Sequence, residues 1–339
     1  DMLGGNHDDF IDANDDAADV QIHGGPGVDT AWYDAGIDPG LTAVENSVAD
    51  PGEEPPPPPP PPAPGECEYR PGTLEVVATM PAAGEATLAV VGGEIRFGAT
   101  PIPCGTATTL NTDSIAIGGA PGTAERLVVD QSAGLLAPGA AGEGNDPEIE
   151  LALALGGADD EVVFVGTAAG DTMAAGLNGV SLNGDGDVDV TFDVLPGRIE
   201  LRGEGGANFL SGRGGFGAGL AYLGILTLVG GDLADELNGG NGNDVIQGGG
   251  GADAISGYAG NDQIDGGAGD DTITGSDGDD SIVGGAGADA MSGGFGNDVL
   301  EADDDEADVQ IHGGPGSDTA YYDAGVDPAT IAVENPIPR

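Results

Sequence analysis

The sequence has almost no positive charge. It contains no lysine and only 7 arginines, against 60 aspartate and glutamate residues. Because proteins neutralise nucleic-acid phosphates with clustered basic side chains, this composition excludes nucleic-acid binding. No window approaches eighteen uninterrupted apolar residues, so we expect no transmembrane span. Aromatic residues make up only 4% of the chain, which disfavours a carbohydrate site built from stacked rings.

Motifs typical of hydrolase active sites are also missing. The chain contains neither H-E-x-x-H nor G-x-S-x-G, and it has only 3 histidines and 1 tryptophan. We therefore predict no catalytic residue and no enzymatic activity in this chain. It opens at Asp1 inside a repeat motif without a signal peptide, so we expect a fragment or a mature piece of a longer polypeptide.

Cysteine is nearly absent, with only Cys67 and Cys104 present. In a chain this rich in glycine and proline, which has the character of an extracellular protein, we predict a disulfide between them. Such a bond would contribute about 2–4 kcal/mol by closing the intervening loop. The alternative is two buried free thiols in a reducing compartment. The sequence thus favours a secreted or cell-surface location.

Glycine and aspartate, by contrast, are abundant and periodic. Eight nonapeptides follow one another without a gap from Gly230 to Glu301. The sixth place is always aspartate: Asp235, Asp244, Asp253, Asp262, Asp271, Asp280, Asp289 and Asp298. The eighth place is always a large aliphatic residue: Leu237, Ile246, Ile255, Ile264, Ile273, Ile282, Met291 and Leu300.

Each nonapeptide, G-G-x-G-x-D-x-U-x, has two physically different halves. The glycines permit positive φ, so backbone carbonyls can turn toward a common point, and the x-U-x half is a short strand with one inward side chain. A disordered acidic spacer is the competing interpretation of such a composition. A spacer has no reason to place an apolar residue at every ninth position, so the pattern favours an ordered solenoid.

The nonapeptides closely resemble the RTX (repeats-in-toxin) calcium-binding family, whose repeat is a standard example of a sequence-readable solenoid. The resemblance implies an all-β fold, a right-handed parallel β-helix or β-roll with two nonapeptides per coil. Calcium ions would lie between turns stacked on one side, with Asp235, Asp253, Asp271 and Asp289 in one row and the other four aspartates in the second. Glycine carbonyls would complete the sites, here those of Gly239, Gly242, Gly248, Gly257, Gly266, Gly269, Gly275, Gly278, Gly284, Gly287 and Gly293. Hard oxygen ligands fit several Ca²⁺ ions, whose binding would be coupled to folding.

A second, longer repeat joins the two ends of the chain. Residues 1–46 align without a gap to residues 290–335 at a constant offset of 289, and 30 of the 46 pairs are identical. The closing segment adds Asp308 and Asp318 as candidate calcium ligands, and its N-terminal copy adds Asp9, Asp19 and Asp29. One module has been duplicated, so we expect neighbouring identical modules in a tandem array, or else docking of the N-terminal copy onto another subunit.

Five regions follow from these patterns. Residues 1–48 are predicted to be the closing coils of a β-roll, and 49–64 a linker whose run of prolines adopts polyproline II over about 30 Å. Residues 65–229 contain many short β-rich segments, for which we favour a parallel β-helix over a β-sandwich. Residues 230–335 form the calcium β-roll with its cap, and 336–339 begin a linker or tail.

Three classes of function remain open. The leading one is a structural module of a secreted tandem-repeat protein, such as a fibre, an adhesin shaft or a surface layer, that extracellular Ca²⁺ folds and stiffens. The second is the non-catalytic export block of a secreted hydrolase. The third is a solenoid that binds carbohydrate or ice, although a regular ladder of exposed threonines is lacking.

Overall fold

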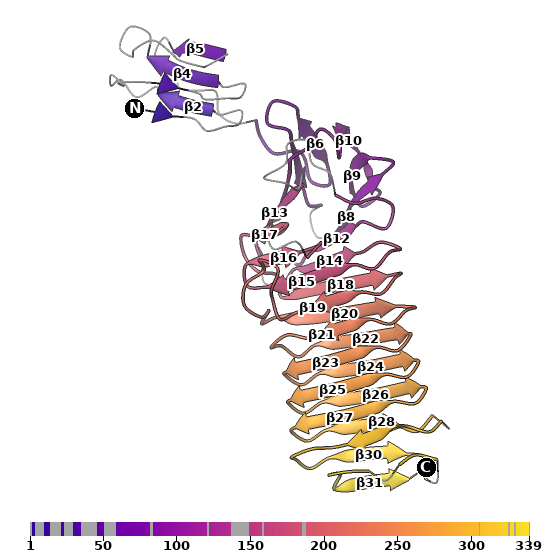
Figure 1. Ribbon diagram of the computed structural model, residues 1–339. Coiled ribbons are helices and arrows are strands. Elements are labelled where there is room, and N and C mark those ends of the chain that lie inside the picture. The colour runs from indigo at the N-terminus through magenta and orange to yellow at the C-terminus, as the bar shows by residue number, and fades with distance from the viewer. Residues whose placement is uncertain are drawn as a thin grey trace. The chain divides into compact units, whose positions relative to one another are not determined.

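The structure, a computed structural model, is built entirely from strands in the residues that it describes (Figure 1). It describes residues 59–81, 84–120, 122–136, 149–157, 159–184, 188–304, 306–324, 326–328 and 330–338, together with the backbone of five short strands before residue 51. Within these residues, no helix is long and apolar enough to cross a membrane. The chain divides into two compact units, residues 1–60 and 61–339.

The second unit is a solenoid bounded by two thirteen-stranded sheets. Sheet I runs in the order β10 (Ile102–Thr108), β9 (Glu94–Gly98), β8 (Glu85–Val91), β12 (Arg126–Asp130), β14 (Glu161–Val165), β18 (Arg198–Glu204), β20 (Ile225–Gly231), β22 (Val245–Gly250), β24 (Gln263–Ala268), β26 (Ser281–Ala286), β28 (Val299–Ala302), β30 (Thr319–Tyr322) and β31 (Asn335–Pro338). Sheet II runs in the order β29 (Gln310–His312), β27 (Ala290–Phe295), β25 (Thr272–Asp277), β23 (Ala254–Ala259), β21 (Glu236–Asn238), β19 (Phe209–Ser211), β15 (Thr172–Gly176), β16 (Gly179–Ser181), β17 (Val190–Phe192), β13 (Glu150–Ala154), β11 (Ser114–Gly118), β7 (Glu75–Thr79) and β6 (Cys67–Arg70).

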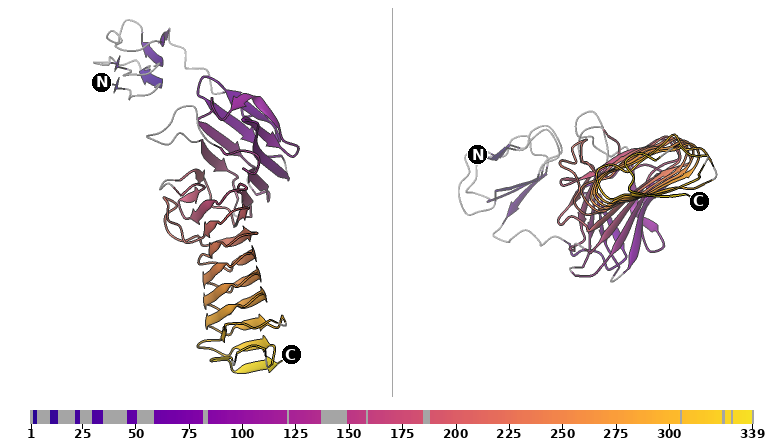
Figure 2. Two further views of the ribbon diagram at one scale, coloured as in Figure 1. Left: turned by 45° about the vertical axis from the view of Figure 1, so that its right-hand side comes forward. Right: turned by 90° about the horizontal axis from the view of Figure 1, so that it is seen from below.

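Successive nonapeptides alternate between the two sheets, so two of them make one coil. Strand β22 pairs in parallel with β24, and β24 with β26, each step advancing the chain by 18 residues. The eighth-place side chains Ile246, Ile264 and Ile282 therefore stack in register inside the solenoid, where all three are buried. Viewed along the stack, the coils superpose as a flattened loop (Figure 2). The aliphatic periodicity thus supplies the core of the predicted β-roll.

The region before the nonapeptides continues the same two sheets. Parallel pairs β7–β11–β13–β17 and β8–β12–β14–β18–β20 bury alternate side chains, for example Leu127 and Val129 in β12. Stacked parallel strands are the arrangement of a β-helix, whereas a sandwich is built from antiparallel sheets. Among the described strands, antiparallel pairing joins β15–β16–β17 and the first strands, β6–β7 and β8–β9–β10. A disulfide joins Cys67 in β6 to Cys104 in β10, linking sheet II to sheet I with a Cα–Cα distance of 5.2 Å.

In the first unit, strand backbones follow the same pairing as the C-terminal coils. The strands are β1 (Met2–Leu3), β2 (Phe10–Ala13), β3 (Ile22–His23), β4 (Thr30–Asp34) and β5 (Asn46–Asp50). Parallel pairing joins β1 to β3 and β2 to β4 to β5, as β27 pairs with β29 and β28 with β30 and β31. Strands β5 and β31 extend beyond residues 48 and 335, where we expected the two roll segments to end. Strand β31 can contain Pro336 and Pro338 because alternate residues of an edge strand face away from the ladder.

Candidate metal centres

Two columns of buried aspartates follow the turns of the roll, one beside each sheet. Each aspartate lies one or two residues before the start of a strand, and each side chain is at least nine-tenths buried. Ladder I, at the starts of sheet I strands, contains Asp244, Asp262, Asp280, Asp298 and Asp318. Ladder II, on the sheet II side, contains Asp235, Asp253, Asp271, Asp289 and Asp308. The structure therefore sorts the predicted aspartates into the two predicted rows and places Asp308 and Asp318 at their ends.

One carboxylate oxygen of each aspartate holds neighbouring coils together. The backbone N–H of Asp244 donates to Oδ1 of Asp262, and the N–H of Asp262 donates to Oδ1 of Asp280, both at 2.8 Å. Ladder II repeats the arrangement, for example from Asp253 N–H to Asp271 Oδ1 at 2.8 Å. Both ladders continue in this way to Asp308 and Asp318. Oδ1 is thus occupied by the protein's own backbone.

The second carboxylate oxygen is left without a partner. In eight of the ten aspartates Oδ2 is fully buried and accepts no hydrogen bond from any described residue. Asp244 differs, because its Oδ2 accepts the N–H of Gly240 at 2.6 Å. A buried carboxylate oxygen without a donor is costly, and it fits a site whose missing partner is a cation.

Backbone carbonyls lie beside these oxygens because the turns contain glycine. A β-carbon on Gly248 would lie 2.4 Å from Asp253 Oδ2 and 2.3 Å from the carbonyl oxygen of Gly266, so only glycine allows this approach. The same crowding by the sixth-place carboxylate recurs at the other first-place glycines, Gly239, Gly257, Gly266, Gly275, Gly284 and Gly293. Fourth-place glycines are crowded differently, by the carbonyl of the preceding coil, at Gly242, Gly269, Gly278 and Gly287.

Burial raises the pKa of several ladder aspartates. Desolvation raises the pKa of Asp244, Asp262 and Asp280 to about 6 and that of Asp308 to about 7, outweighing the backbone hydrogen bonds that lower it. No arginine or lysine occurs between Gly214 and Pro338. The protein therefore provides no cationic side chain in this stretch to neutralise the ladders.

The donor set can be tested against possible metals. Within the described residues, no three histidine, cysteine or acidic side chains converge on one point, so a bound ion must take backbone oxygens as well as carboxylates. Oxygen-only donors with several carbonyls suit Ca²⁺, whereas zinc and copper prefer nitrogen or sulfur. The residues therefore fit calcium.

Comparison with known families agrees with this donor set. The family model for the RTX calcium-binding nonapeptide repeat matches residues 229–264 and 265–300. Residues 229–300 belong to the RTX calcium-binding repeat family. Residues 229–300 are accordingly a calcium-binding repeat module with the β-roll fold of RTX repeats, and such repeats are generally structural. A search of curated proteins found no match.

Several residues of the ladders escaped sequence analysis. Asp327 and Glu334 accept the final hydrogen bonds from the N–H groups of Asp308 and Asp318, and Asn208 continues ladder II above Asp235. None of these lies in a regular nonapeptide, so the motif gives no signal for them.

A further ladder at the fifth place of alternate RTX repeats also went unnoticed. The Asn261 N–H donates to Asn243 Oδ1 at 2.9 Å, and the Asp279 N–H to Asn261 Oδ1 at 3.0 Å. Recurrent Asn or Asp at that place could have predicted it. The candidate ligands Asp9, Asp19 and Asp29 lie outside the described residues.

Proposed function

We propose that the turns of the RTX roll bind Ca²⁺ through Oδ2 of their sixth-place aspartates, most of which have no hydrogen-bond donor at that oxygen. The carbonyls of first- and fourth-place glycines in adjacent coils supply further oxygens, and several ions occupy each ladder. This proposal rests on one observation: ladder carboxylate oxygens are buried without donors in a stretch that contains no basic residue. Ion binding then neutralises each column and stabilises the stacked coils.

The module's role, we propose, is structural: a calcium-stiffened segment of a secreted or cell-surface tandem-repeat protein, such as a fibre, an adhesin shaft or a surface layer. Calcium at extracellular concentrations suits the modest affinities, on the order of 10⁻⁴–10⁻³ M, of extracellular modules. Residues 1–48 and 230–335 would be roll segments, 65–229 a β-helix continuous with the second roll, and 49–64 a proline-rich spacer.

Strand edges support contact between modules. Strands β1 and β2 lie at the edges of their sheets, whereas their counterparts β27 and β28 pair with β25 and β26 of the preceding coil. Exposed strand edges readily pair with another chain or module. The 289-residue duplication supports such a contact, because an identical module would supply counterparts of β25 and β26 in the same register.

Small-angle X-ray scattering of the chain, with calcium and in excess chelator, tests the structural role. We expect the scattering in chelator to show a more expanded and flexible chain than the scattering in calcium, because the RTX coils lose their folded stack. Identical curves in both conditions would refute a calcium-stiffened module. The denaturing, reducing mass of the parent polypeptide tests the array separately, because a parent of about 33.0 kDa would contain only this chain.

A further inference from the structure

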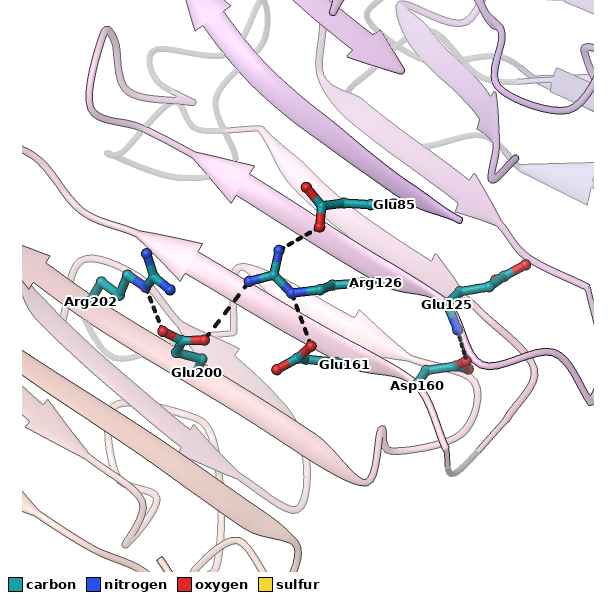
Figure 3. Close-up of polar contacts among 7 residues, drawn as sticks. All are labelled: Glu85, Glu125, Arg126, Asp160, Glu161, Glu200 and Arg202. Atoms are coloured by element: carbon teal, nitrogen blue, oxygen red, sulfur yellow. Dashed lines mark hydrogen bonds and ion pairs between the residues drawn. The ribbon is translucent and has the colours of Figure 1, made fainter. Parts of the chain in front are cut away.

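We propose a calcium site outside the RTX repeats, between Glu125 and Asp160 in the upper coils of the second unit. These residues immediately precede β12 and β14, which are adjacent parallel strands of sheet I (Figure 3). Both side chains are buried, with 3% of Glu125 and 0% of Asp160 exposed. Neither residue falls within the segment that matches the RTX family model.

The two carboxylates reproduce the bonding of the RTX ladders. The Glu125 N–H donates to Asp160 Oδ1 at 2.9 Å, as each ladder aspartate donates to the next. Glu125 Oε1 accepts the N–H of Ala120 at 3.0 Å and the hydroxyl of Thr123 at 3.2 Å. Glu125 Oε2 and Asp160 Oδ2 remain buried, and no described residue donates a hydrogen bond to either.

Glycine again brings a carbonyl next to the unpartnered oxygen. A β-carbon on Gly119 would lie 2.0 Å from Glu125 Oε2 and 2.7 Å from the carbonyl oxygen of Leu155 in the following coil. A β-carbon on Gly157 would lie 3.2 Å from Asp160 Oδ2. The crowding at Gly119 matches that at Gly248, where a carboxylate and the next coil's carbonyl also meet. Glu125 Oε2, the Leu155 carbonyl and, in the same following turn, Asp160 Oδ2 are hard oxygen donors of the kind that suits Ca²⁺.

No arginine neutralises this pair. Arg126 is the neighbour of Glu125 in sequence, but its guanidinium contacts Glu85 at 2.8 Å, Glu161 at 2.9 Å and Glu200 at 4.0 Å (Figure 3). Arg126 therefore pairs with carboxylates on the outer face of sheet I. Two buried acids with unpartnered oxygens and no cation remain, which is the condition found in the RTX ladders.

Asp171, another acid of the upper coils, does not share this condition. Asp171 precedes β15 and sits at the head of ladder II, yet its Oδ2 accepts the Thr167 N–H at 2.9 Å and its Oδ1 the Thr167 hydroxyl at 3.1 Å. Its carboxylate is thus satisfied by the protein. The proposed site is also separate from ladder I, because Gly197 and Gly224 occupy the corresponding positions before β18 and β20.

Native mass spectrometry of the full chain, counting bound calcium, tests the proposal. Asp160→Asn keeps Oδ1 as acceptor for the Glu125 N–H and replaces only the unpartnered oxygen. Glu125→Gln does the same for Oε1 and Oε2. We expect each variant to bind one ion fewer than the wild type and Asp171→Asn to bind the full number. An unchanged count in both Asp160→Asn and Glu125→Gln would overturn the proposal, as would an equal loss in Asp171→Asn.

A second measurement guards against misfolding and against the alternative that the two acids share a proton. Circular dichroism in calcium reports whether each variant keeps its β structure, and Glu125→Gln decides the test if Asp160→Asn does not fold. A shared proton predicts an unchanged ion count together with a higher melting temperature of Asp160→Asn in chelator, and that result overturns the proposal. Because the RTX sites are intact in both variants, the result is independent of whether the roll binds calcium as proposed.

Discussion

At the scale of single residues, the two oxygens of each ladder aspartate have different roles. Oδ1 bonds to the backbone of the neighbouring coil, and Oδ2 remains available for a cation. Asparagine can replace only the first role, as Asn208 does where it continues ladder II above Asp235. The requirement for aspartate in the repeats thus follows from the second oxygen, since the coil-to-coil bond alone would accept an amide.

Protonation should substitute in part for calcium. In calcium-stripped protein, burial raises the pKa of Asp262 and Asp280 from 3.8 to about 6. Because the folded pKa exceeds the unfolded one, this contribution to stability is fully present below about pH 4 and is lost as the pH rises through about 6. We expect circular dichroism of stripped protein to show more β structure at pH 5 than at pH 7.5. Equal spectra at the two values would contradict a roll limited by its carboxylate charge.

Glycine at the fourth place should be required in the regular coils that follow the first nonapeptide, whose fourth residue is Leu233. Gly269 has φ of +129°, and an added β-carbon would lie 1.7 Å from the carbonyl oxygen of Gly251. Strain and overpacking together should make Gly269→Ala less stable by roughly 2–4 kcal/mol in calcium. Gly250→Ala is the control, since its nearest neighbour would be 3.6 Å away, and we expect a change within about 0.5 kcal/mol. Similar denaturation midpoints for the two variants would show that the turns are more adaptable than described.

How far single residues could be predicted depends on the regularity of their surroundings. The sixth-place aspartates and the eighth-place aliphatics follow a strict period, so their burial and stacking could be read from the sequence. Glu125 and Asp160 could not, although each follows a Gly-Gly pair and precedes a strand. The turns that contain Glu125 and Asp160 differ in length from a nonapeptide. The two residues are therefore identified by their hydrogen bond in the folded structure and not by their spacing in the sequence.

At the scale of the element, the repeating unit is a coil of two strands and two turns. Each coil bonds only to its neighbours, through parallel strands and through the aspartate Oδ1 contacts. Stability in such a solenoid is the sum of coil and interface terms, so the loss of one site weakens two adjacent interfaces. Substitution of one ligand should therefore change the structure only in the adjacent coils and still shift the folding midpoint.

Asp262→Asn should separate ion binding from coil pairing. The amide oxygen can still accept the Asp244 N–H, while the unpartnered Oδ2 is lost. We expect the calcium concentration at the folding midpoint to rise and the stability in calcium to fall by roughly 1–3 kcal/mol. Asp265→Asn, at an exposed position of β24, is the matched control and should leave both unchanged. Equal shifts in a calcium titration followed by circular dichroism would indicate a general charge effect instead of a site.

Elements of the upper coils show what the sequence could not supply. Their short apolar segments predicted strands. Because the coils vary in length, no sequence period indicates which strands pair or that β15, β16 and β17 pair antiparallel. The disulfide likewise follows from the presence of two cysteines, whereas its link between the first strands of sheets I and II is a feature of the folded topology. Regular repeats allow the strand register to be predicted from the sequence, whereas the register of the irregular coils depends on packing in the folded structure.

At the scale of the whole molecule, the upper coils and the RTX roll differ in how their carboxylates are neutralised. The upper coils use arginine, with Arg126 and Arg202 bridging carboxylates on sheet I, including a contact between Arg202 and Glu200. The RTX roll has no arginine or lysine and leaves its ladder oxygens unpartnered. The whole chain has a formal net charge of -53 at pH 7, and the roll contributes no arginine or lysine to offset it, so the roll depends on cations from solution.

Hydrogen exchange of the backbone amides in residues 230–335, measured at neutral pH in calcium and in excess chelator, tests this dependence most directly. We expect slow exchange in calcium and loss of protection across β22 to β30 in chelator, with recovery when calcium is restored. Protection in the arginine-bridged strands β12 and β14 should decline less. Full protection of the roll in chelator would contradict the claim that calcium binding and folding of the RTX repeats are one event.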